Sequence, residues 1–311
     1  MTAPQLSVVL PTHNRPALLM QALGSVLAQE GVEVEVIVVD DASSDETPAV
    51  LSRVNDERLT VLRHETPKGP AAARNAGIDR AEGDWVAFLD DDDFFAPDKL
   101  RIQVEDAERQ GSSFSYCGRI EIDESGAVIQ QRLMSQNPSL AVELLEDNLI
   151  GGPSAVIARS DLLAEVGDFD ERLPPLEDWD LWIRAAAAGP AAIRREPLYA
   201  YRRHPDNLWI TAATRIPDAF EVMREKHASA ASHAGVEFGS AWIARWTAAR
   251  DIAEGRRLRA ARRLLRSAAT ERNMRDAARA LLALGGGRSQ KLGMSAMARF
   301  TPRPDWLDRH V

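Results

Sequence analysis

The sequence predicts an α/β protein whose mostly parallel sheet is flanked by helices and followed by an all-helical C-terminal extension. Three observations lead to this prediction. Short runs rich in Val, Ile and Leu alternate with helix-permissive stretches over roughly the first hundred residues, polar residues stand where these runs end, and no strand-like run follows Ala219. Strands that alternate with helices form parallel sheets covered on both faces.

The first half of the α/β part is predicted to contain four strands and two helices. The strands are expected at 6–10, 34–40, 58–64 and 84–90, and the helices at 16–29 and 69–83. β-branched runs of this length are typical of buried strands. The second helix is rich in alanine and has glycines near its two ends. In such a sheet a ligand lies outside the carboxyl ends of the strands.

The second half is predicted to continue the α/β pattern. A hairpin is expected from strands at 114–123 and 126–134, then a strand and short helix within 154–170, a helix at 177–189 and a strand at 192–204. Gly189-Pro190 ends the helix. A boundary is expected near 205–217, which gives an α/β domain over residues 1–214, with halves meeting near residue 110, and a helical region over 215–311.

The composition limits the protein class. With 311 residues, 45% of them hydrophobic, the chain is long enough for a substantial core. Its one cysteine, Cys117, excludes an internal disulfide and a multi-cysteine zinc site, and is expected as a small strand residue. Because no signal-like segment and no apolar stretch of ~20 residues occurs, we expect a cytoplasmic protein, attached at most peripherally to the inner membrane face.

The charge is divided unevenly along the chain. Residues 1–214 carry 19 Lys and Arg against 37 Asp and Glu, whereas residues 215–311 carry 19 against 10. On a helical wheel of the basic region, two stripes separate: Leu258, Ala261, Leu265 and Ala268, and Arg259, Arg262, Arg263 and Arg266. We expect the first stripe to pack and the second to stay solvated. One hypothesis is that these helices help to hold the acceptor or a partner, with anionic membrane lipid as one docking surface; a helical dimer or a packing extension is an equal alternative. Nucleic-acid binding is not expected without interleaved aromatic residues.

Four aspartates, Asp90 to Asp93, stand directly after the run "WVAFL". Neighbouring carboxylates disfavour one another's ionisation unless water or a cation screens them. Oxygen-rich clusters at strand ends suit hard divalent cations such as Mg²⁺ or Mn²⁺. The alternative is a solvated turn. We favour metal binding because of the strand-end position.

Other polar residues are expected at the same edge of the sheet. They are Pro11, Thr12, Asn14 and Arg15 after the first strand, and Asp40 and Asp41 at the end of the second. Taken singly, Thr12 or Asn14 can serve a turn and Asp45 can cap a helix. Convergence of three strand ends favours a common crevice.

The sequence resembles family 2 glycosyltransferases, inverting nucleotide-sugar enzymes with the GT-A fold. Four segments carry the resemblance over about residues 5–205: "VVLPTHNRPALLMQALGSVLAQ", "EVIVVDDASSDET", "GPAAARNAGIDRAEGDWVAFLDDDDFFAPDKL" and "EDWDLWIRAAAAG". One departure is Ala42, which stands where many members have glycine. The resemblance implies that residues 1–110 bind the nucleotide sugar and that 111–214 face the acceptor.

The resemblance also implies roles for individual residues. The nucleotide-contacting set is Pro11, Thr12, Asn14 and Arg15, with Asp41 reading the base, Arg74 near the base or diphosphate, and Asp90 or Asp91 near the ribose or metal shell. Asp92 is the expected metal ligand, and His204 matches a histidine that in some members lies near the metal or diphosphate. Asp178 matches the catalytic base. Mn²⁺ or Mg²⁺ is the implied cofactor.

The chemistry is consistent with these roles. Inverting displacement at an anomeric carbon needs a carboxylate to take the acceptor proton and a cation to stabilise the departing diphosphate. Asp178 and Asp92 can divide these tasks. Alternatively, Glu177 and Asp178 only complement a helix dipole. Trp179 and Trp182 are expected either to stack on an acceptor or, for at least Trp182, to pack in the core.

We therefore expect a metal-dependent inverting enzyme that moves one sugar from a nucleoside-diphosphate donor, with UDP favoured, to a hydroxyl of a sugar, lipid-linked or protein acceptor in cell-surface or secreted glycoconjugate synthesis. Processive members carry Gln-x-x-Arg-Trp, but here "WIARW" has Trp242 in the glutamine position. The alternatives are a nucleotidyltransferase of related fold and a non-catalytic nucleotide-sugar-binding or scaffold protein. No Gly-x-Gly-x-x-Gly supports a dinucleotide oxidoreductase.

Overall fold

The computed structural model describes residues 5–134, 139–205, 207, 214–253, 255–270, 280, 284 and 303–309. It divides into two compact units. Unit 1 comprises Met1–Leu140, Ile150–Met223 and Arg303–Val311, and unit 2 comprises Ala141–Leu149 and Arg224–Pro302. The expected boundary at residue 214 therefore differs from the observed division. Phe220 stays with unit 1 beside Trp179, and Leu307 returns to unit 1 in a cluster with Phe94.

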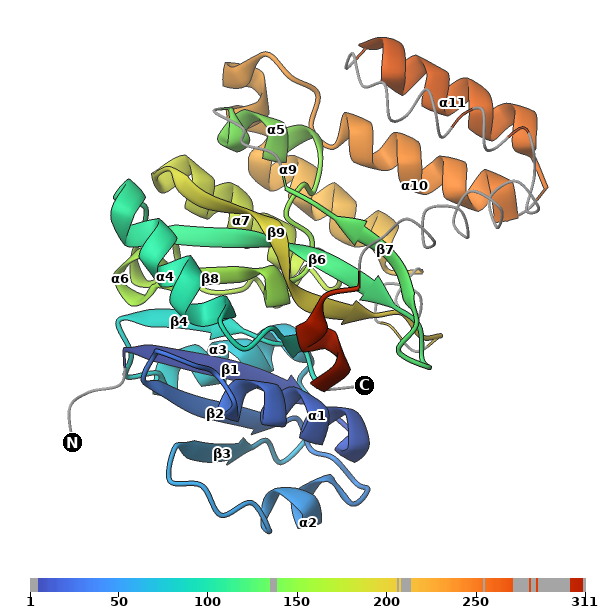
Figure 1. Cartoon of the computed structure of the whole chain (residues 1–311). Helices are drawn as coiled ribbons and strands as arrows, with labels where there is room; N and C mark the ends of the chain where they lie inside the picture. The colour runs from blue at the N-terminus through green and yellow to red at the C-terminus, as the bar shows by residue number, and fades with distance from the viewer. Residues whose placement is uncertain are drawn as a thin grey trace. The chain divides into compact units, whose positions relative to one another are not determined.

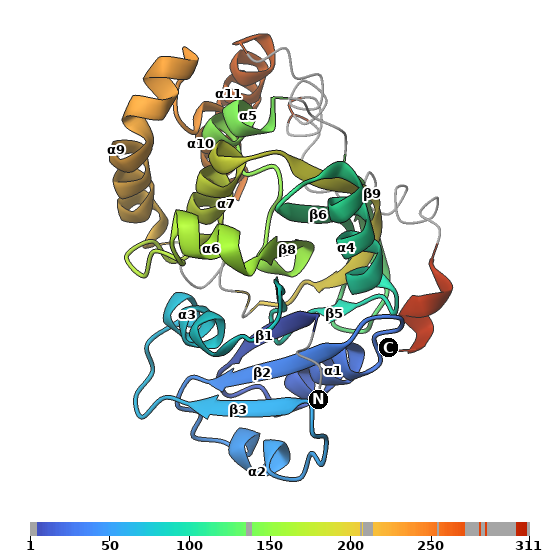
Figure 2. The ribbon, with the colours of Figure 1, turned by 90° about the vertical axis from the view of Figure 1, so that its left-hand side faces the viewer.

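Unit 1 is built on a nine-stranded sheet (Figures 1 and 2). Its strands are β1 (Leu6–Thr12), β2 (Val34–Asp40), β3 (Leu59–Arg63), β4 (Trp85–Phe88), β5 (Phe94–Phe95), β6 (Phe114–Ile122), β7 (Val128–Arg132), β8 (Val156–Arg159) and β9 (Ala191–Arg202). They follow the order β3-β2-β1-β4-β8-β6-β9-β5, and β7 pairs with β6. All strands expected from the sequence are present, and β5 is additional.

The sheet contains four neighbouring parallel strands at one side and a further parallel pair at the other. β3, β2, β1 and β4 are parallel to one another, whereas β8 is antiparallel to both β4 and β6. β6 and β9 are again parallel. Because the chain runs outward from β1 to β2 on one side and to β4 on the other, a crevice opens at the carboxyl ends of these strands.

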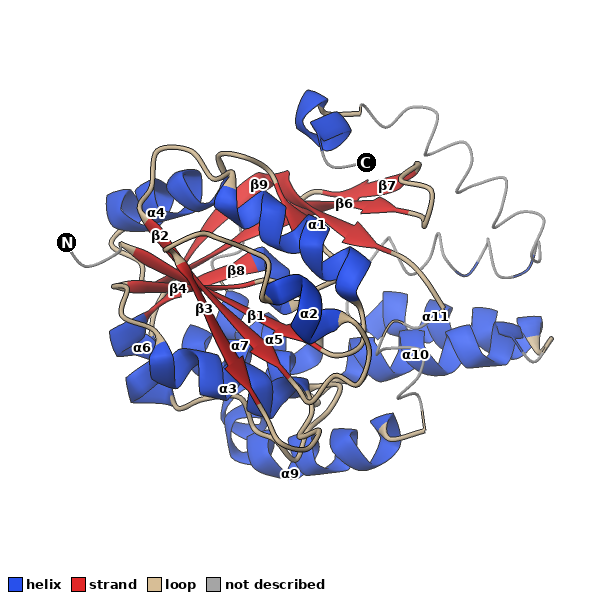
Figure 3. Ribbon diagram, turned by 90° about the horizontal axis from the view of Figure 1, so that it is seen from below, coloured by secondary structure: helices blue, strands red, loops and turns tan. Residues whose placement is uncertain are grey.

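Helices cover both faces of this sheet. They are α1 (Pro16–Leu27), α2 (Thr47–Leu51), α3 (Pro70–Arg80), α4 (Lys99–Gln110), α6 (Ser160–Val166) and α7 (Glu177–Ala188), with short 3-10 turns η1 (Pro153–Ala155) and η2 (Asp305–Arg309). α1 and α4 lie on one face and α3 and α6 on the other (Figure 3). Gly77 lets α3 approach the sheet closely, because a Cβ there would lie 2.3 Å from Val9 Cγ1.

Unit 2 contains helices only among its described residues. They are most of α5 (Leu140–Glu146), the later turns of α9 (Ile216–Ala234), α10 (Ser240–Ala253) and α11 (Arg257–Thr270). No described helix has the length and apolar character needed to cross a membrane.

The packed face of α11 differs from the expected stripe. Leu258 and Leu265 are 69% and 49% exposed, whereas Ala260 and Leu264 are buried in a cluster with Ala248 of α10. Small residues allow close helix approach. Asp251 of α10 also fixes the rotation, because it pairs with Arg256 and Arg263 at 2.8 and 3.0 Å. The prediction that Leu258 and Leu265 pack was therefore wrong, and the same error placed Arg263 among the solvated arginines. Ala261 of the expected stripe is buried, at 3% exposed.

Candidate active site

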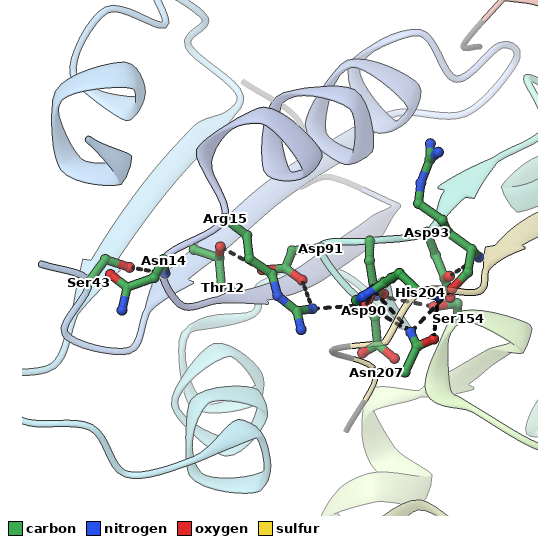
Figure 4. Close-up of polar contacts among 12 residues, drawn as sticks. Thr12, Asn14, Arg15, Ser43, Asp90, Asp91, Asp93, Ser154, His204 and Asn207 are labelled. Carbon is green, nitrogen blue, oxygen red and sulfur yellow. Dashed lines mark hydrogen bonds and ion pairs between the residues drawn. The ribbon is translucent and has the colours of Figure 1, made fainter. Parts of the chain in front are cut away.

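The acidic loop, Asp90 to Asp93, follows β4 at the carboxyl edge of the parallel strands. One carboxylate oxygen from each of Asp90, Asp92 and Asp93 lies within 4.8 Å of the others. Figure 4 shows Asp91 directed toward Thr12 and Arg15, and Asp93 on the side of Ser154. The loop thus divides its four carboxylates between a convergent set of three and one that faces the end of β1.

Asp91 ties the acidic loop to the first strand. Its Oδ2 accepts a hydrogen bond from Thr12 Oγ1 at 2.8 Å, and its Oδ1 accepts one from Arg15 Nη1 at 3.1 Å. Burial, together with the neighbouring charge of Asp92, raises the pKa of Asp91 to about 6. Thr12 and Arg15 therefore lie at the acidic loop, as the convergence of strand ends predicted.

Asp92, in the acidic loop, contacts side chains from the loop after β1 and from the segment after β9. Its Oδ2 lies 2.9 Å from Arg15 Nη1, 2.9 Å from His204 Nε2 and 3.4 Å from Asn207 Nδ2. His204 and Asn207 follow β9, more than 100 positions along the chain. The structure thus brings His204 to the acidic loop as a neighbour of Asp92.

Asp93 accepts hydrogen bonds from two neighbouring segments. Its Oδ1 accepts the backbone N–H of Arg202 at 3.2 Å, and Ser154 supplies a side-chain hydrogen bond. Ser154 Oγ also accepts the N–H of Asp90 at 3.1 Å. Burial and the charges of Asp92 and Asp90 raise the pKa of Asp93 well above its usual range.

These residues fit a hard divalent cation. Three carboxylates converge, and burial, followed by the charges of neighbouring aspartates, raises the pKa values of Asp91 and Asp93. Oxygen ligands of this kind are the ones that Mg²⁺ and Mn²⁺ take in proteins. Asp90, Asp92 and Asp93 provide the convergent oxygens, and His204 stands beside Asp92.

The loop after β1 is braced by the loop after β2. Asn14 has a left-handed φ of 54°; its N–H donates to Ser43 Oγ at 2.9 Å and its Oδ1 accepts from Ser44 N at 2.8 Å. Ala42 is also left-handed, with a φ of 60°. This conformation favours glycine, the residue that many members of the resembled family have at this position. Pro11 is buried within β1, opposite Val39.

Asp41 fixes the start of α3. Its Oδ1 accepts from Lys68 N at 2.8 Å and lies 2.7 Å from His64 Nδ1, and its Oδ2 accepts from Gly69 N at 2.8 Å. Burial acts to raise the pKa of Asp41, but these hydrogen bonds outweigh it and lower the pKa. The carboxylate is therefore held ionised at the edge of the crevice.

Arg74 of α3 lies between two carboxylates. Its Nη2 donates to Asp90 Oδ1 at 2.6 Å and its Nη1 to Glu177 Oε1 at 3.0 Å. The side chain is buried, at 5% exposed. Sequence reasoning did not pair Arg74 with either acid, because Glu177 lies 103 positions away.

Asp178 differs from the acids beside it. Glu177 is paired with Arg74, and Asp180 with Arg184 at 2.7 Å. Within the described chain Asp178 has no arginine partner; its Oδ1 accepts only the N–H of Trp179, at 2.6 Å. Burial and the charge of Glu177 raise the pKa of Asp178 well above its usual range. Among the three acids at the start of α7, Asp178 is the one for which the described part of the chain shows no ion pair.

The two tryptophans of α7 are core residues. Trp179 and Trp182 are both 0% exposed. Trp182 donates its Nε1–H to the carbonyl of Gly151 at 3.2 Å and contacts the rings of Phe88 and Phe169. The interpretation of these rings as an acceptor-stacking wall is wrong, since no face of either ring is open to a ligand.

Two further site residues were missed in the sequence. Ser154, in "GGPSAV", and Asn207, shortly after "YRRH", both contact the acidic loop. A glycine-rich turn leading into β8 was the available signal for Ser154. Asn207 lay beyond the last predicted strand and gave no signal of its own.

Comparison with known proteins identifies the family. A family model described as Glycosyl transferase family 2 matches residues 7–167, just over half of the chain. The succinoglycan biosynthesis protein ExoO of Rhizobium meliloti is 34% identical over 197 residues, 60% of this chain and 57% of that protein. The putative teichuronic acid biosynthesis glycosyltransferase TuaG of Bacillus subtilis is 33% identical over 158 residues, 50% of this chain and 63% of that protein. The chain thus spans only about 60% of the length of these relatives.

Solved structures resemble the fold. Residues 1–349 of TarS from S. aureus, in complex with UDP-GlcNAc, align with a TM-score of 0.58 and 25% identity over 71% of this chain and 64% of that one. The mannosyltransferase PcManGT from Pyrobaculum calidifontis, in complex with GDP-Man and Mn²⁺, aligns with a TM-score of 0.58 over 99% of this chain and 86% of that one, at 19% identity. These alignments, with the α/β sheet and C-terminal helices, confirm the expected fold class. Because the family model covers more than half of its residues, the chain belongs to glycosyl transferase family 2.

Proposed function

We propose that this glycosyltransferase is a metal-dependent, inverting enzyme that transfers one sugar from a UDP-sugar to a hydroxyl acceptor. The observation that carries the proposal is the acidic loop, whose three convergent carboxylates lie at the switch point of the parallel strands. In sheets of this kind a nucleotide binds at the carboxyl ends of the strands. The similarity to the UDP-GlcNAc complex of TarS supports a uridine donor.

The chain's own residues have distinct tasks in this proposal. The nucleotide would be surrounded by Pro11, Thr12, Asn14, Arg15 and Asp41. Asp90 and Asp91 would lie near the ribose or the metal shell. Asp92 would hold Mn²⁺ or Mg²⁺, with His204 beside it. A cation bound there stabilises negative charge on the departing diphosphate. Asp90 and Asp93 supply the further oxygens of the convergent set.

Asp178 is the proposed general base. A base of raised pKa takes a hydroxyl proton more readily than an ordinary aspartate does. Burial and Glu177 raise its pKa, and this effect outweighs the lowering effect of Arg74. Direct attack of the activated hydroxyl on the anomeric carbon inverts its configuration.

Single addition is favoured over processive synthesis. In the position of the glutamine of processive members, Trp242 is buried and its ring stacks on Trp246 at 6.1 Å. The names of ExoO and TuaG support a place in the synthesis of a cell-surface or secreted polysaccharide.

We also propose that α11 contacts an anionic membrane surface. Its exposed face carries Leu258 and Leu265 beside the exposed side chains of Arg259 and Arg262. Apolar side chains interleaved with cations suit the headgroup region of anionic lipids. The proposal predicts that vesicles of phosphatidylcholine and phosphatidylglycerol sediment the protein, and that Leu258→Ser with Leu265→Ser abolishes sedimentation. Val61→Ser, at an exposed valine of unit 1, is the matched control. Equal binding to neutral vesicles would contradict this proposal.

The experiment that tests the main proposal is calorimetric titration with UDP, GDP and dTDP, each with and without Mn²⁺. We expect Mn²⁺-dependent binding of UDP that Asp92→Asn abolishes. Asp161→Asn is the control, because Asp161 is 67% exposed and lies outside the site. Nucleotide binding that ignores both Mn²⁺ and Asp92→Asn would refute the metal-dependent site.

Two alternatives have separate readouts. A nucleotidyltransferase would bind a nucleoside triphosphate more tightly than UDP in the same titrations. A non-catalytic binding protein would keep its biological activity when Asp178 is replaced by Asn. The contacts of Arg15 with Asp91 and Asp92 speak against a triphosphate-gripping loop, since the one arginine after β1 is already committed to carboxylates.

A further inference from the structure

We propose that Arg74 is a positioning residue that couples the acidic loop to the helix carrying the base, by holding one carboxylate from each on a single buried guanidinium. The inference rests on the proposed function, because it assigns Asp178 as the base. It changes the role of Arg74 from the nucleotide contact that the family resemblance implies to a link between the two halves of the reaction site.

The geometry of the link is specific. The two terminal nitrogens of Arg74 each serve a different acid: Nη2 lies 2.6 Å from Asp90 Oδ1 and Nη1 lies 3.0 Å from Glu177 Oε1. Arg74 belongs to α3, Asp90 follows β4, and Glu177 is the first residue of α7. One side chain therefore joins three elements that are distant in sequence.

The burial of Arg74 argues against a direct nucleotide contact in this arrangement. The residue is 4% exposed, and its guanidinium lies over the ring of Phe169 at 5.4 Å. Among the described residues, neither the remaining nitrogen, Nε, nor Glu177 Oε2 has a hydrogen-bond partner. With both terminal nitrogens engaged by carboxylates, the buried guanidinium presents almost no surface to the crevice.

Arginine is the side chain that this position requires. Its planar fork presents two nitrogens in fixed directions, so it can serve two carboxylates at once, whereas a lysine ammonium is a single point charge. Removal of the guanidinium would leave Glu177 as a buried, unpaired carboxylate, which is strongly unfavourable. The N-terminus of α7 would then lose its fixed distance from the acidic loop.

The link also sets the electrostatic surroundings of Asp178. The groups that act on its carboxyl are Glu177, Arg74, Asp90 and the N–H of Trp179. Glu177 and Asp90 raise the pKa of Asp178, and Arg74 and the N–H lower it. The two partners of the link therefore have opposite effects on the base.

This opposition gives a sharp test. Arg74→Met and Glu177→Gln both break the link, and both should lower kcat by about 10²-fold, as expected for misplaced catalytic groups. Arg74→Met should move the acid limb of the kcat–pH profile to higher pH, whereas Glu177→Gln should move it to lower pH. Arg74→Lys, which keeps the charge, should restore the pH limb but only part of kcat. A merely structural role would not reverse the direction.

The measurements need no identified acceptor. UDP release is followed with water as acceptor on whichever UDP-sugar the wild type hydrolyses, and the Asp178 carboxyl is titrated by ¹³C NMR, assigned with Asp178→Asn. Calorimetry with UDP and Mn²⁺ should give a Kd within about threefold of wild type for Arg74→Lys, since only positioning is lost. Arg80→Lys is the matched control, because Arg80 lies on the same helix in an exposed pair with Glu82.

The outcomes separate this inference from the proposed function. Loss of UDP binding in Arg74→Lys with kcat retained would show a nucleotide contact and overturn the inference. Identical titration of Asp178 in wild type, Arg74→Met and Glu177→Gln would overturn it as well. Full activity of Asp178→Asn would instead refute the assigned base. If Arg74→Met does not fold, Glu177→Gln and Arg74→Lys still decide the question.

Discussion

The guanidinium of Arg15 lies 2.9 Å from Asp92 Oδ2, so a cationic side chain of the first loop sits on the carboxylate expected to hold the metal. The same nitrogen also contacts Asp91 at 3.1 Å. Arg15 thus balances part of the charge of the acidic loop. A divalent ion bound at Asp92 would therefore compete with the guanidinium of Arg15 for the same carboxylate.

This contact predicts opposite effects of Arg15→Ala on two ligands. Without the guanidinium the acidic loop is more negative, so Mn²⁺ alone should bind more tightly, by roughly tenfold for ~1.4 kcal/mol of removed competition. UDP should bind more weakly because a positive charge beside the proposed nucleotide site is lost. Calorimetry with each ligand separately checks both directions. Weaker binding of Mn²⁺ alone, as in Asp92→Asn, would contradict the competition.

Asp178→Asn is expected to lower kcat by about 10²–10⁴-fold, the usual contribution of a general base. The pKa of Asp178 is raised by burial and by Glu177. A base acts when ionised, so wild-type activity should fall as the pH drops through this raised pKa, well above the ~3.9 of a free aspartate. The pH profile of UDP release measures it. An acid limb near pH 4 would show that the carboxyl is not perturbed.

Lys99 is a buried ammonium without a hydrogen-bond partner among the described residues, and it lies over the ring of Phe95 at 4.1 Å. Burial lowers the pKa of Lys99 to about 8. Because the unfolded lysine titrates near ~10.4, the unfolded state binds more protons between these values, and stability should rise as the pH increases from about 8 to about 10.5. Lys99→Met should raise the free energy of unfolding at pH 7 by roughly 1–3 kcal/mol and flatten this dependence. Urea denaturation at pH 7 and pH 9.5 tests it. A destabilised Lys99→Met would mean that the ammonium is satisfied.

Ala42→Gly is expected to stabilise the protein by roughly 0.5–1 kcal/mol, because a left-handed alanine is strained and glycine is not. The φ of Ala42 is 60°. Gly111→Ala is the reverse control: its φ is 62° and an added Cβ would meet no atom within 4 Å, so only backbone strain would be introduced. Thermal unfolding should shift upward for the first variant and downward for the second. If both variants shifted the unfolding temperature in the same direction, backbone strain would not explain the effect of Ala42→Gly.

The packing of α11 predicts different costs at adjacent leucines. Leu264 is 3% exposed and Leu265 is 49% exposed. Leu264→Ala should destabilise unit 2 by about 2–5 kcal/mol, whereas Leu265→Ala should be close to neutral. Amide hydrogen exchange of α10 and α11 measures both. A larger loss of stability for Leu265→Ala than for Leu264→Ala would instead support packing of the stripe expected from the helical wheel.

Much of the parallel half of the sheet follows from sequence. The runs of β1, β2 and β4 are short, apolar and β-branched because both of their faces are buried, and such runs are readable without knowing their neighbours. β5 was missed because it has only two residues, Phe94–Phe95, and exists through its pairing with β9. α4 was missed although its signals were present: Asp98 precedes it, and Gly111 ends it with a left-handed φ of 62°.

The site was predictable where it depends on strand ends and not where it depends on distant partners. Polar residues after β1, β2 and β4 had to meet because parallel strands share one carboxyl edge. The pairing of Arg74 with Glu177 depends on where α7 packs against the sheet. This position follows from the strand order β4-β8-β6-β9, which local periodicity in the sequence does not encode. The tryptophans of α7 were ambiguous for the same reason, since their burial depends on Phe88 and Phe169.

The return of the C-terminal segment to unit 1 has a consequence for how the chain can be divided. Leu307 is fully buried with Phe94 and Ile120, and the ring of Trp306 lies 6.3 Å from that of Phe94. Phe94 directly follows Asp93. The helical unit is therefore an insertion with both ends anchored in the α/β unit, and it cannot be removed as a simple tail. A protein cut before Arg303 would lose Trp306 and Leu307, the apolar side chains that pack on Phe94 directly after the acidic loop.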